Sequence, residues 1–264
     1  MVDSVRGEIQ VHQDFEGRTA LVTGASRGIG AATAKALARS GAARVVLHYG
    51  SHRAGAEEAA EAVRSAGAEA AVIGADLSRL DGVSAFLETL KRTAPGVDIL
   101  VNNAGSLVKR ATLPESTPEL YDEVYNLNVK SLWFITQAVA PHMVSQGRGV
   151  IVNVSSIAAR NGGGPGATLY ASAKAAVAAM TKGLAKELAP HGVRVNAISP
   201  GTVDNYFHEK FSNQEILSNV VKMTPQGRLS TNEDMAEVIL FLCSDAARNV
   251  IGQTIEVNGG AFMI

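Results

Sequence analysis

Short apolar runs alternate with longer, helix-like runs along most of the chain. The apolar runs are TALVTG, RVVLHY, EAAVIGA, VDILVNN, GVIVNVS, VRVNAIS and QTIEVN, at residues 19–24, 44–49, 69–75, 97–103, 149–155, 193–199 and 253–258. Most of them are apolar at consecutive positions rather than at every second position. This pattern predicts strands that are buried on both faces of a parallel sheet.

The stretches between these runs are rich in alanine and other helix-forming residues. They predict helices over 28–40, 54–66, 79–93, about 116–146, 170–189 and 231–244. Strands that alternate with helices form right-handed crossovers and a doubly wound sheet. No linker, break in composition or low-complexity segment divides the chain. We therefore predict a single-domain α/β Rossmann fold, a seven-stranded parallel sheet with helices on both faces, over residues 16–264, after an N-terminal extension at 1–15.

The composition of the chain limits which binding partners and which cellular compartment we expect for the protein. The formal charge of −1 does not indicate a nucleic acid or an anionic membrane as a partner. No apolar run reaches the ~18 residues of a membrane span, and the first residues lack the hydrophobic region of a signal peptide. Cys243 is the only cysteine and lies in the apolar run VILFLCS, which indicates a core residue in a reducing compartment. We expect a cytoplasmic protein without a metal site.

The first predicted strand leads directly into TGASRGIG, residues 23–30. Gly24, Gly28 and Gly30 allow a tight turn and a close approach of the backbone to a ligand. The helix that follows offers unpaired N–H groups and the positive end of its dipole to a phosphate. A glycine triplet alone also occurs in ordinary turns, but between a first strand and a helix it predicts a dinucleotide site.

The end of the second strand indicates which dinucleotide binds. A free ribose 2′-hydroxyl usually meets an acidic residue about 20 residues beyond the glycines, but residues 17–56 contain no Asp or Glu. Tyr49, Ser51, His52 and Arg53 stand there instead, and Arg27 lies inside the glycine turn. A pocket with arginine and no acid favours the 2′-phosphate of NADP(H) over NAD(H). If Arg53 only starts a solvated helix, the missing acid still argues against NAD(H).

Two further strand ends carry small or polar residues. Asp76, after the third strand, is either an acceptor for the adenine amino group or the N-cap of the next helix, with Ser78 as a competitor for the cap. The fourth strand ends in NNAG, residues 102–105. Small residues there let the backbone lie against a cofactor, and the asparagine side chains can tie neighbouring strands together.

Tyr170 and Lys174 are four residues apart in a predicted helix, so they share one face. A phenol has a pKa near ~10 and exchanges protons poorly at neutral pH. A neighbouring ammonium group stabilises the phenolate, and we expect Lys174 to lower the pKa of Tyr170 in this way. Tyr170 could then exchange a proton with a substrate oxygen, and a serine hydroxyl from the fifth strand could hold that oxygen.

With these motifs in this order, the chain resembles the short-chain dehydrogenase/reductase family over about residues 16–260. The shared motifs are TGASRGIG (23–30), NNAG (102–105), Asn128 in NLNVKS, VNVSS (152–156), YASAK (170–174), SPG (199–201) and GQTIEVNGG (252–260). Within the family it most resembles the 3-oxoacyl-carrier-protein reductase-like branch, which contains many enzymes that act on other ketones, sugars and alcohols. The resemblance implies hydride transfer between a nicotinamide and a carbonyl carbon.

The resemblance also implies roles for individual residues. Tyr170 is the general acid of ketone reduction, Lys174 lowers its pKa and holds the nicotinamide ribose, and Asn128 anchors a water in a proton relay. Pro200 and Gly201 shape the nicotinamide pocket. The full set of expected cofactor-binding residues is Gly24, Ser26, Arg27, Gly28, Ile29, Gly30, Tyr49, Ser51, Arg53, Asp76, Leu77, Asn103, Ala104, Gly105, Tyr170, Lys174, Pro200, Gly201, Thr202 and Val203.

The catalytic serine fits the family pattern less closely. In the family it usually precedes the tyrosine by about thirteen residues, whereas Ser156 precedes Tyr170 by fourteen and Ser155 by fifteen. A loop of glycines at 161–166 could absorb one extra residue without shifting the strand or the helix. The second serine of VNVSS is the position that the family uses, so we assign Ser156 and treat Ser155 as its neighbour at the strand end.

Residues 202–230 correspond to the mobile lid that the family places over its substrate. Leu107, Arg160 and Asn161 could also approach the substrate, although a surface position is the simpler interpretation of Arg160. Neither a small polar carbonyl compound nor an acyl thioester is favoured as the substrate. The resemblance further implies a homotetramer.

Other functions remain open at this point. One is an NAD(H)-dependent alcohol or sugar dehydrogenase of the same family, and another is a non-enzymatic nucleotide-binding regulator. The joint presence of Asn128, Ser156, Tyr170 and Lys174 argues against the regulator. An enoyl-thioester reductase would usually have a longer spacing between its tyrosine and its lysine.

Overall fold

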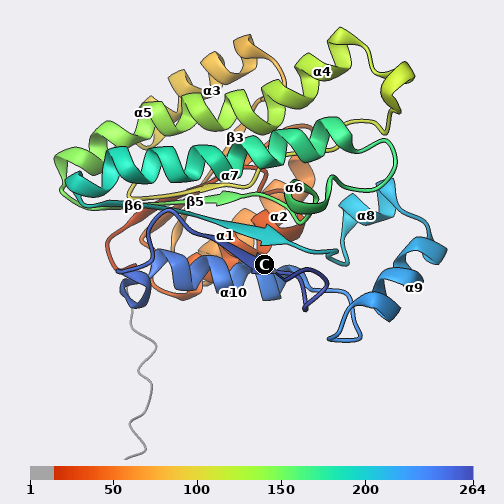
Figure 1. Ribbon diagram of the computed structural model, residues 1–264. Helices are drawn as coiled ribbons and strands as arrows, with labels where there is room; N and C mark the ends of the chain where they lie inside the picture. Colours follow the sequence, from red (N-terminus) through yellow and green to blue (C-terminus); the bar gives the residue numbers. More distant parts are fainter. Residues whose placement is uncertain (1–14, 264) are drawn as a thin grey trace, which may run out of the picture.

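A seven-stranded parallel sheet lies at the centre of the protein, as predicted (Figure 1). The structure is a computed structural model and describes residues 15–263. The strand order is β3-β2-β1-β4-β5-β6-β7, and all neighbouring strands pair in parallel. The strands are β1 (Thr19–Val22), β2 (Arg44–Tyr49), β3 (Glu69–Gly74), β4 (Ile99–Asn102), β5 (Gly149–Val154), β6 (Val193–Pro200) and β7 (Thr254–Val257).

Helices cover both faces of the sheet (Figure 1). One layer holds α1 (Gly28–Arg39), α2 (Arg53–Ser65) and α10 (Asn232–Cys243), and the other holds α3 (Leu80–Thr93), α5 (Ser131–Ser145) and α7 (Thr168–Leu188). Side chains of one strand alternate between the two cores, so Ala20 and Val22 pack on the first layer and Leu21 packs on the second. This double burial explains why the strands are apolar at consecutive positions.

One predicted helix is wrong. The stretch expected as a single helix over about 116–146 contains α4 (Pro118–Tyr125), a π-helical turn η2 (Asn126–Lys130) and α5. The amide of Asn128 donates a hydrogen bond to the carbonyl of Val124, 2.9 Å away, inside this stretch. Hydrophobic periodicity does not distinguish a wide turn from a regular one, which is why the sequence predicted one continuous helix.

Short helices complete the connections between the larger elements. These are η1 (Leu113–Glu115), α6 (Ala158–Asn161), η3 (Ala189–His191), α8 (Tyr206–Phe211), α9 (Gln214–Met223) and η4 (Asp245–Ala247). Helix α7 begins at Thr168, two residues before its predicted start. Within residues 15–263, no helix is long and apolar enough to cross a bilayer.

The expected N-terminal extension at 1–15 lies outside the described residues except for Phe15. The Phe15 side chain is 2% exposed and packs into the core beneath β1 and α10. Packing of the first layer therefore begins one residue earlier than predicted, because Phe15 contributes a large apolar side chain to that core.

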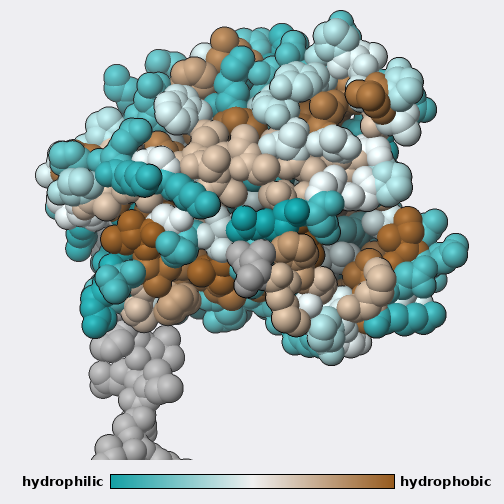
Figure 2. Space-filling view, viewed as in Figure 1, coloured by the Kyte–Doolittle hydropathy of each residue, from teal (hydrophilic) through white to brown (hydrophobic). Residues whose placement is uncertain are grey.

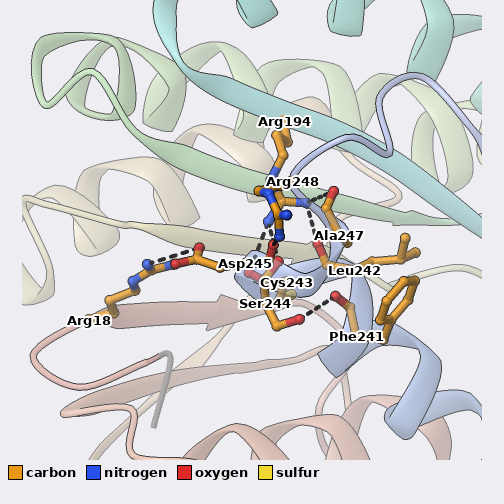
Figure 3. A network of polar contacts seen from close by, with 9 residues as sticks. All are labelled: Arg18, Arg194, Phe241, Leu242, Cys243, Ser244, Asp245, Ala247 and Arg248. Atoms are coloured by element: carbon orange, nitrogen blue, oxygen red, sulfur yellow. Dashed lines mark hydrogen bonds and ion pairs between the residues drawn. The ribbon is translucent and has the colours of Figure 1, made fainter. Parts of the chain in front are cut away.

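Arg194 on β6 holds the C-terminal end of α10 (Figure 3). Its Nη1 donates to the carbonyls of Leu242 and Ala247, at 2.6 and 3.2 Å, and its Nη2 donates to those of Cys243 and Ser244, at 3.1 and 2.9 Å. The last carbonyls of a helix have no partner within the helix and carry the negative end of its dipole. A guanidinium group satisfies them and ties α10 to the sheet.

Cys243 is itself fully buried, as predicted, and burial raises the pKa of its thiol to about 12.

Candidate active site

The carboxyl ends of β4, β5 and β6 open into a cavity of about 590 Å³ beside α7. In an open parallel sheet this edge is where ligands bind. The cavity brings together many of the residues that the sequence singled out. They are Ile29, Asn103, Gly105, Leu107, Ser156, Asn161, Tyr170, Lys174, Pro200, Gly201, Thr202 and Val203.

Lys174 lies at the base of this cavity and is 3% exposed. Its Nζ donates a hydrogen bond to the carbonyl of Val154, 2.9 Å away, and lies 5.7 Å from the centroid of the Tyr170 ring. Because Val154 is the last residue of β5, this bond fixes the lysine against the strand that carries the serine pair. Tyr170 and Lys174 share one face of α7, as their spacing predicts.

Burial, rather than the lysine, sets the pKa values of this pair. Burial raises the pKa of Tyr170 to about 12, although a side-chain hydrogen bond with Ser156 acts in the opposite direction. Burial also lowers the pKa of Lys174 to about 8. The expectation that Lys174 brings the phenol below its ordinary pKa is therefore wrong for this structure, because desolvation of the phenolate outweighs the stabilising contacts. At neutral pH the phenol carries its proton.

The two serines after β5 have different partners. The hydroxyl of Ser155 donates to the carbonyl of Lys174 at 2.8 Å, and the residue is 2% exposed. The side chain of Ser156 lines the cavity, is hydrogen-bonded to Tyr170, and accepts a hydrogen bond from the backbone N–H of Ala158 at 3.1 Å. Ser155 thus ties the strand to α7, while Ser156 faces the phenol.

The glycine run between these serines and Tyr170 forms a loop from the end of α6 to the start of α7. Gly162 and Gly163 have φ of 83° and 74°, in the left-handed region that glycine adopts without strain. Gly163 and Gly164 line the cavity. The loop therefore forms one wall of the cavity.

Asn128 sits in the π-helical turn and is 1% exposed. Its amide donates to the carbonyl of Ser106 at 2.9 Å, and its Oδ1 accepts from the N–H of Ser106 at 3.2 Å. Gly105 lies between Asn128 and Lys174. A β-carbon at Gly105 would come within 2.6 Å of Asn128 Oδ1 and 2.8 Å of Lys174 Nζ. The glycine of NNAG thus lets both polar side chains approach the same point.

The asparagines of NNAG connect neighbouring strands, as predicted. Asn102 Nδ2 donates to Oδ1 of Asn153 on β5 at 3.0 Å. Asn103 Nδ2 donates to the carbonyls of Thr23 and Gly24, just after β1, at 2.9 and 3.0 Å. These bonds hold the ends of β1, β4 and β5 in register beneath the cavity.

A second cavity, of about 630 Å³, adjoins the first and shares Gly105, Asn205 and Phe207 with it. It contains the glycine turn, where Gly24 and Gly28 have φ of 64° and 59°. From the expected cofactor-binding residues it includes Gly24, Ser26, Arg27, Gly28, Ser51, Asp76, Leu77, Ala104 and Gly105. The two cavities lie side by side along the carboxyl edge of the sheet, and the second is called the groove below.

Three of the expected cofactor-binding residues line neither cavity. Gly30 packs inside the turn, where a β-carbon would lie 2.3 Å from the carbonyl oxygen of Gly24. The ring of Tyr49 lies over Gly74 on β3. Arg53 is exposed at the start of α2 and pairs with Glu57 at 3.5 Å, which fits the alternative that it starts a solvated helix.

Asp76 lines the groove but is not a helix cap. Its Oδ1 accepts from the N–H and the hydroxyl of Ser78 at 3.0 and 2.7 Å. Helix α3 begins at Leu80, with Arg79 at the N-cap position and no side-chain cap. The N-cap alternative is therefore wrong, because Asp76 and Ser78 close a turn of their own before the helix.

His48 supports the glycine turn, and sequence reasoning missed it. The N–H of Gly24 donates to His48 Nδ1 at 3.1 Å, and Nε2 lies 3.0 Å from the carbonyl of Ala75. Burial lowers the pKa of His48 to about 4, so the imidazole is neutral at pH 7. With Nδ1 as an acceptor, Nε2 carries the proton and donates to Ala75. A histidine within an otherwise apolar strand was the available signal.

The region expected as a lid, residues 202–230, carries α8 and α9. Its two ends are joined, because Ser230 N–H donates to the carbonyl of Thr202 at 3.1 Å and Asp204 N–H donates to that of Ser230 at 2.9 Å. On the groove side, the Arg27 guanidinium lies 3.6 Å from the centroid of the Tyr206 ring. The lid therefore touches the glycine turn directly.

Arg160 is neither a surface charge nor a residue of the cavity. Its Nε donates to the carboxylate of Glu256 on β7 at 2.8 Å, and both side chains are largely buried. Arg110, which sequence reasoning did not single out, lines the cavity instead. The signal for Arg110 was weak, because it lies in a segment without periodicity between NNAG and α4.

Comparison with known proteins identifies the family. The family model described as enoyl-(acyl carrier protein) reductase matches residues 24–261. A 3-oxoacyl-[acyl-carrier-protein] reductase of Staphylococcus epidermidis is 36% identical over 93% of this chain and 99% of its own length. An L-rhamnose 1-dehydrogenase (NAD(P)(+)) of Azotobacter vinelandii is 40% identical over 93% and 97%. The chain belongs to the short-chain dehydrogenase/reductase family, in the branch of the 3-oxoacyl-carrier-protein reductases, and is an oxidoreductase of that family acting on CH–OH or C=O groups.

Solved structures agree with this assignment. A putative NAD(P)-dependent gluconate 5-dehydrogenase from Beutenbergia cavernae with bound NADP superposes with a TM-score of 0.87 and is 37% identical, over 94% of this chain and 98% of the other. A 7α-hydroxysteroid dehydrogenase in complex with NADH and 7-oxo glycochenodeoxycholic acid gives a TM-score of 0.88 and 33% identity, over 95% and 96%. Similar proteins thus use either nicotinamide cofactor.

Proposed function

We propose that the protein is an NADP(H)-dependent reductase that converts a ketone or other carbonyl compound to an alcohol, and catalyses the reverse reaction when alcohol and oxidised cofactor are supplied. The observation that carries this proposal is the cluster of Ser156, Tyr170 and Lys174 in a cavity that adjoins the glycine-lined groove. A nucleotide lying along that groove would bring its reactive end to the phenol.

The groove fits a dinucleotide. Backbone at Gly24 and Gly28 is open on the groove side, and the N-terminus of α1 begins beside it. NADP(H), when bound, exchanges a hydride with the reacting carbon. Arg27, inside the glycine turn, and Ser51, after β2, line the groove, and none of residues 17–56 is acidic. These features support a 2′-phosphate and hence NADP(H) over NAD(H).

Tyr170 is the proposed proton donor to the carbonyl oxygen. Its phenol holds a proton at neutral pH, and the Ser156 hydroxyl beside it can hold the same substrate oxygen. Lys174, with a pKa near 8, can return the proton to Tyr170 after transfer. Asn128, buried against the Ser106 backbone, is the proposed anchor of the water that reconnects Lys174 to solvent. In alcohol oxidation the same proton moves in the opposite direction.

An NAD(H)-dependent alcohol or sugar dehydrogenase is the second candidate. The L-rhamnose dehydrogenase relative and the NADH complex of the 7α-hydroxysteroid dehydrogenase favour it. Direct titration decides between the cofactors: tighter binding of NADPH than of NADH supports the first proposal, and the reverse order contradicts it. A regulator without chemistry would bind a cofactor and reduce nothing.

We also propose a homotetramer in the cytoplasm. Large apolar side chains are exposed on α4 and α5, namely Tyr121 and Trp133, at 45% and 42%. Hydrophobic side chains also gather near α10 at the lower left of Figure 2. Helix α10 carries Phe241, which is 46% exposed. These two areas would be the subunit contacts, and light scattering of the purified protein measures the assembly.

The experiment that tests the function is a substrate screen. Ketones, keto sugars, keto acids and acyl thioesters are offered with NADPH and with NADH while the loss of reduced cofactor is followed by absorbance. Reduction of at least one carbonyl compound, faster with NADPH, supports the proposal. Binding of cofactor with no turnover on any class supports the regulator instead.

A further inference from the structure

Among residues 15–263, none of those that line the cavity around Tyr170 is acidic. Its lining includes two residues that are always or often cationic, Arg110 and Lys174, and one histidine, His208. Lys174 lies at the base, bonded to Val154 and beside Tyr170. Arg110 is exposed and belongs to the outer part, next to the glycine loop and the lid. The cavity therefore has one positive charge at its base and a second one toward its mouth.

Arg110 is held in a defined orientation. Its Nε donates to the carbonyl of Phe211 at the end of α8, 3.1 Å away, and its Nη1 donates to the carbonyl of Pro165 in the glycine loop, 2.8 Å away. Within residues 15–263, no carboxylate pairs with Arg110, and Nη2 makes no hydrogen bond. The guanidinium group is thus held by neutral carbonyls and not by a carboxylate.

His208 adds no second positive charge beside Arg110 at neutral pH. Burial and, to a smaller extent, the nearby charge of Arg110 lower the pKa of His208 to about 4 against the opposing effect of Asp204, so the imidazole is neutral at pH 7. Its Nδ1 lies 3.1 Å from the hydroxyl of Ser212. Arg110 is therefore the cation that a substrate meets at this end of the cavity.

Phe207, on the lid, adds an aromatic ring to the cavity beside the phenol, 5.7 Å from the Tyr170 ring, centroid to centroid. Phe211, whose ring lies 5.0 Å from that of Phe207, lines the second cavity and contacts Arg110 through its backbone carbonyl. Ile216 and Val220 of the lid add further apolar lining.

We propose that the substrate is a carbonyl compound that also carries an anionic group, a carboxylate or a phosphate, several bonds from the carbonyl, and that Arg110 binds this group. The proposal rests on the reductase function above and names its substrate class. A fork of N–H donors matches the geometry of either anion. The alternative is that Arg110 only fastens the lid to the glycine loop.

The test uses any uncharged ketone that the screen finds to be reduced. Pentanoate, pentyl phosphate and pentanamide are compared as competitive inhibitors of its reduction, so that charge and the kind of anion are varied on one apolar chain. The wild-type protein is expected to bind the preferred anion about tenfold or more tightly than the amide. The inhibitor with the lower inhibition constant identifies carboxylate or phosphate as the bound group.

Three variants assign the effect to Arg110. Arg110→Met is expected to abolish the preference for the anion over the amide, and Arg110→Lys to keep part of it. Lys109→Met removes a neighbouring exposed cation that does not line the cavity and is expected to keep the full preference. The measured quantity is the ratio of the inhibition constants of anion and amide. A variant that only displaces the lid would weaken both inhibitors alike and leave this ratio unchanged.

Measurements on the wild-type protein keep the proposal testable if Arg110→Met does not fold. The inhibition constant of the anion is then expected to rise with added salt, while that of the amide stays constant. Equal inhibition by anion and amide, or an anion preference that persists in Arg110→Met, overturns the proposal and leaves the reductase function intact. If no carbonyl compound is reduced at all, the proposed function itself fails.

Discussion

The ammonium group of Lys174 donates a hydrogen bond to the backbone carbonyl of Val154, and the carbonyl of Lys174 in turn accepts one from the hydroxyl of Ser155. The end of strand β5 and the middle of helix α7 are thus joined in both directions. Because Ser156 and Tyr170 extend from these two elements, the pair of bonds fixes the distance between the serine and the phenol.

This arrangement predicts different effects for the two serines. Ser156→Ala is expected to lower kcat by about 10²-fold, because it removes a hydroxyl aimed at the reacting oxygen, with little change in the free energy of unfolding. Ser155→Ala is expected to lose about 1 kcal/mol of stability, the contribution of one buried hydrogen bond, and to keep most of its turnover. Steady-state kinetics and urea unfolding of both variants are the measurements. A larger loss of turnover in Ser155→Ala at equal stability would reverse the assignment.

Lys174 is expected to make stability depend on alkaline pH. Its pKa is about 8 in the folded protein and 10.5 ordinarily, so between these values the unfolded chain binds a proton that the folded chain does not. Stability of the wild type relative to Lys174→Met should therefore rise with pH from about 8 to about 10.5, by at most about 1.4 kcal/mol per pH unit. Urea unfolding of both proteins at pH 7.5 and 9.5 measures it, and a constant difference would contradict the prediction.

His48 is expected to make the stability of the fold depend on pH in the acid range. Its pKa falls from 6.5 to about 4 on folding, so its contribution to stability is fully present above pH 6.5 and is lost as pH falls toward 4. Protonation of Nδ1 would also remove the acceptor for the Gly24 N–H. The stability difference between the wild type and His48→Asn, from urea unfolding at several pH values, should shrink over this range. A difference that does not change between pH 7 and pH 4 would count against this role.

Arg194 is expected to stabilise the fold without affecting catalysis. Arg194→Met leaves the carbonyls of Leu242 and Cys243 at the end of α10, and those of Ser244 and Ala247 just after it, without their donor, and is expected to cost about 2–4 kcal/mol. Arg248→Met, at an exposed arginine of the same segment, is expected to cost less than about 0.5 kcal/mol. Thermal or urea unfolding gives both values. Equal costs would show that the four bonds contribute little.

The fold was predictable because its main determinant is local. Strands buried on both faces are apolar at consecutive positions, as in VVL at 45–47, and alternate with helices of clear amphipathic or alanine-rich character. The π-helical turn at Asn126–Lys130 was not predictable, since it depends on side-chain bonds of Asn128 to backbone far along the chain. Hydrophobic periodicity does not record such bonds.

The residues of the site that belong to a sequence motif could be predicted. Those whose role depends on tertiary contacts could not. The spacing of Tyr170 and Lys174 and the glycine turn located the groove. His48 and Arg110 escaped notice because their roles come from contacts between distant segments, such as β2 with the glycine turn and the loop after β4 with the lid. Arg53 was included for its charge, but its position at the start of α2 directs it to Glu57.

Replacement of Tyr170 by phenylalanine tests the central claim most directly. The variant keeps the ring and its contact with Phe207 but lacks the hydroxyl that is hydrogen-bonded to Ser156. On a carbonyl compound that the wild type reduces, kcat of Tyr170→Phe is expected to fall by about 10²–10⁴-fold, while cofactor binding, measured by titration, stays close to that of the wild type. Near-full turnover by Tyr170→Phe would contradict the assignment of the phenol as the proton donor.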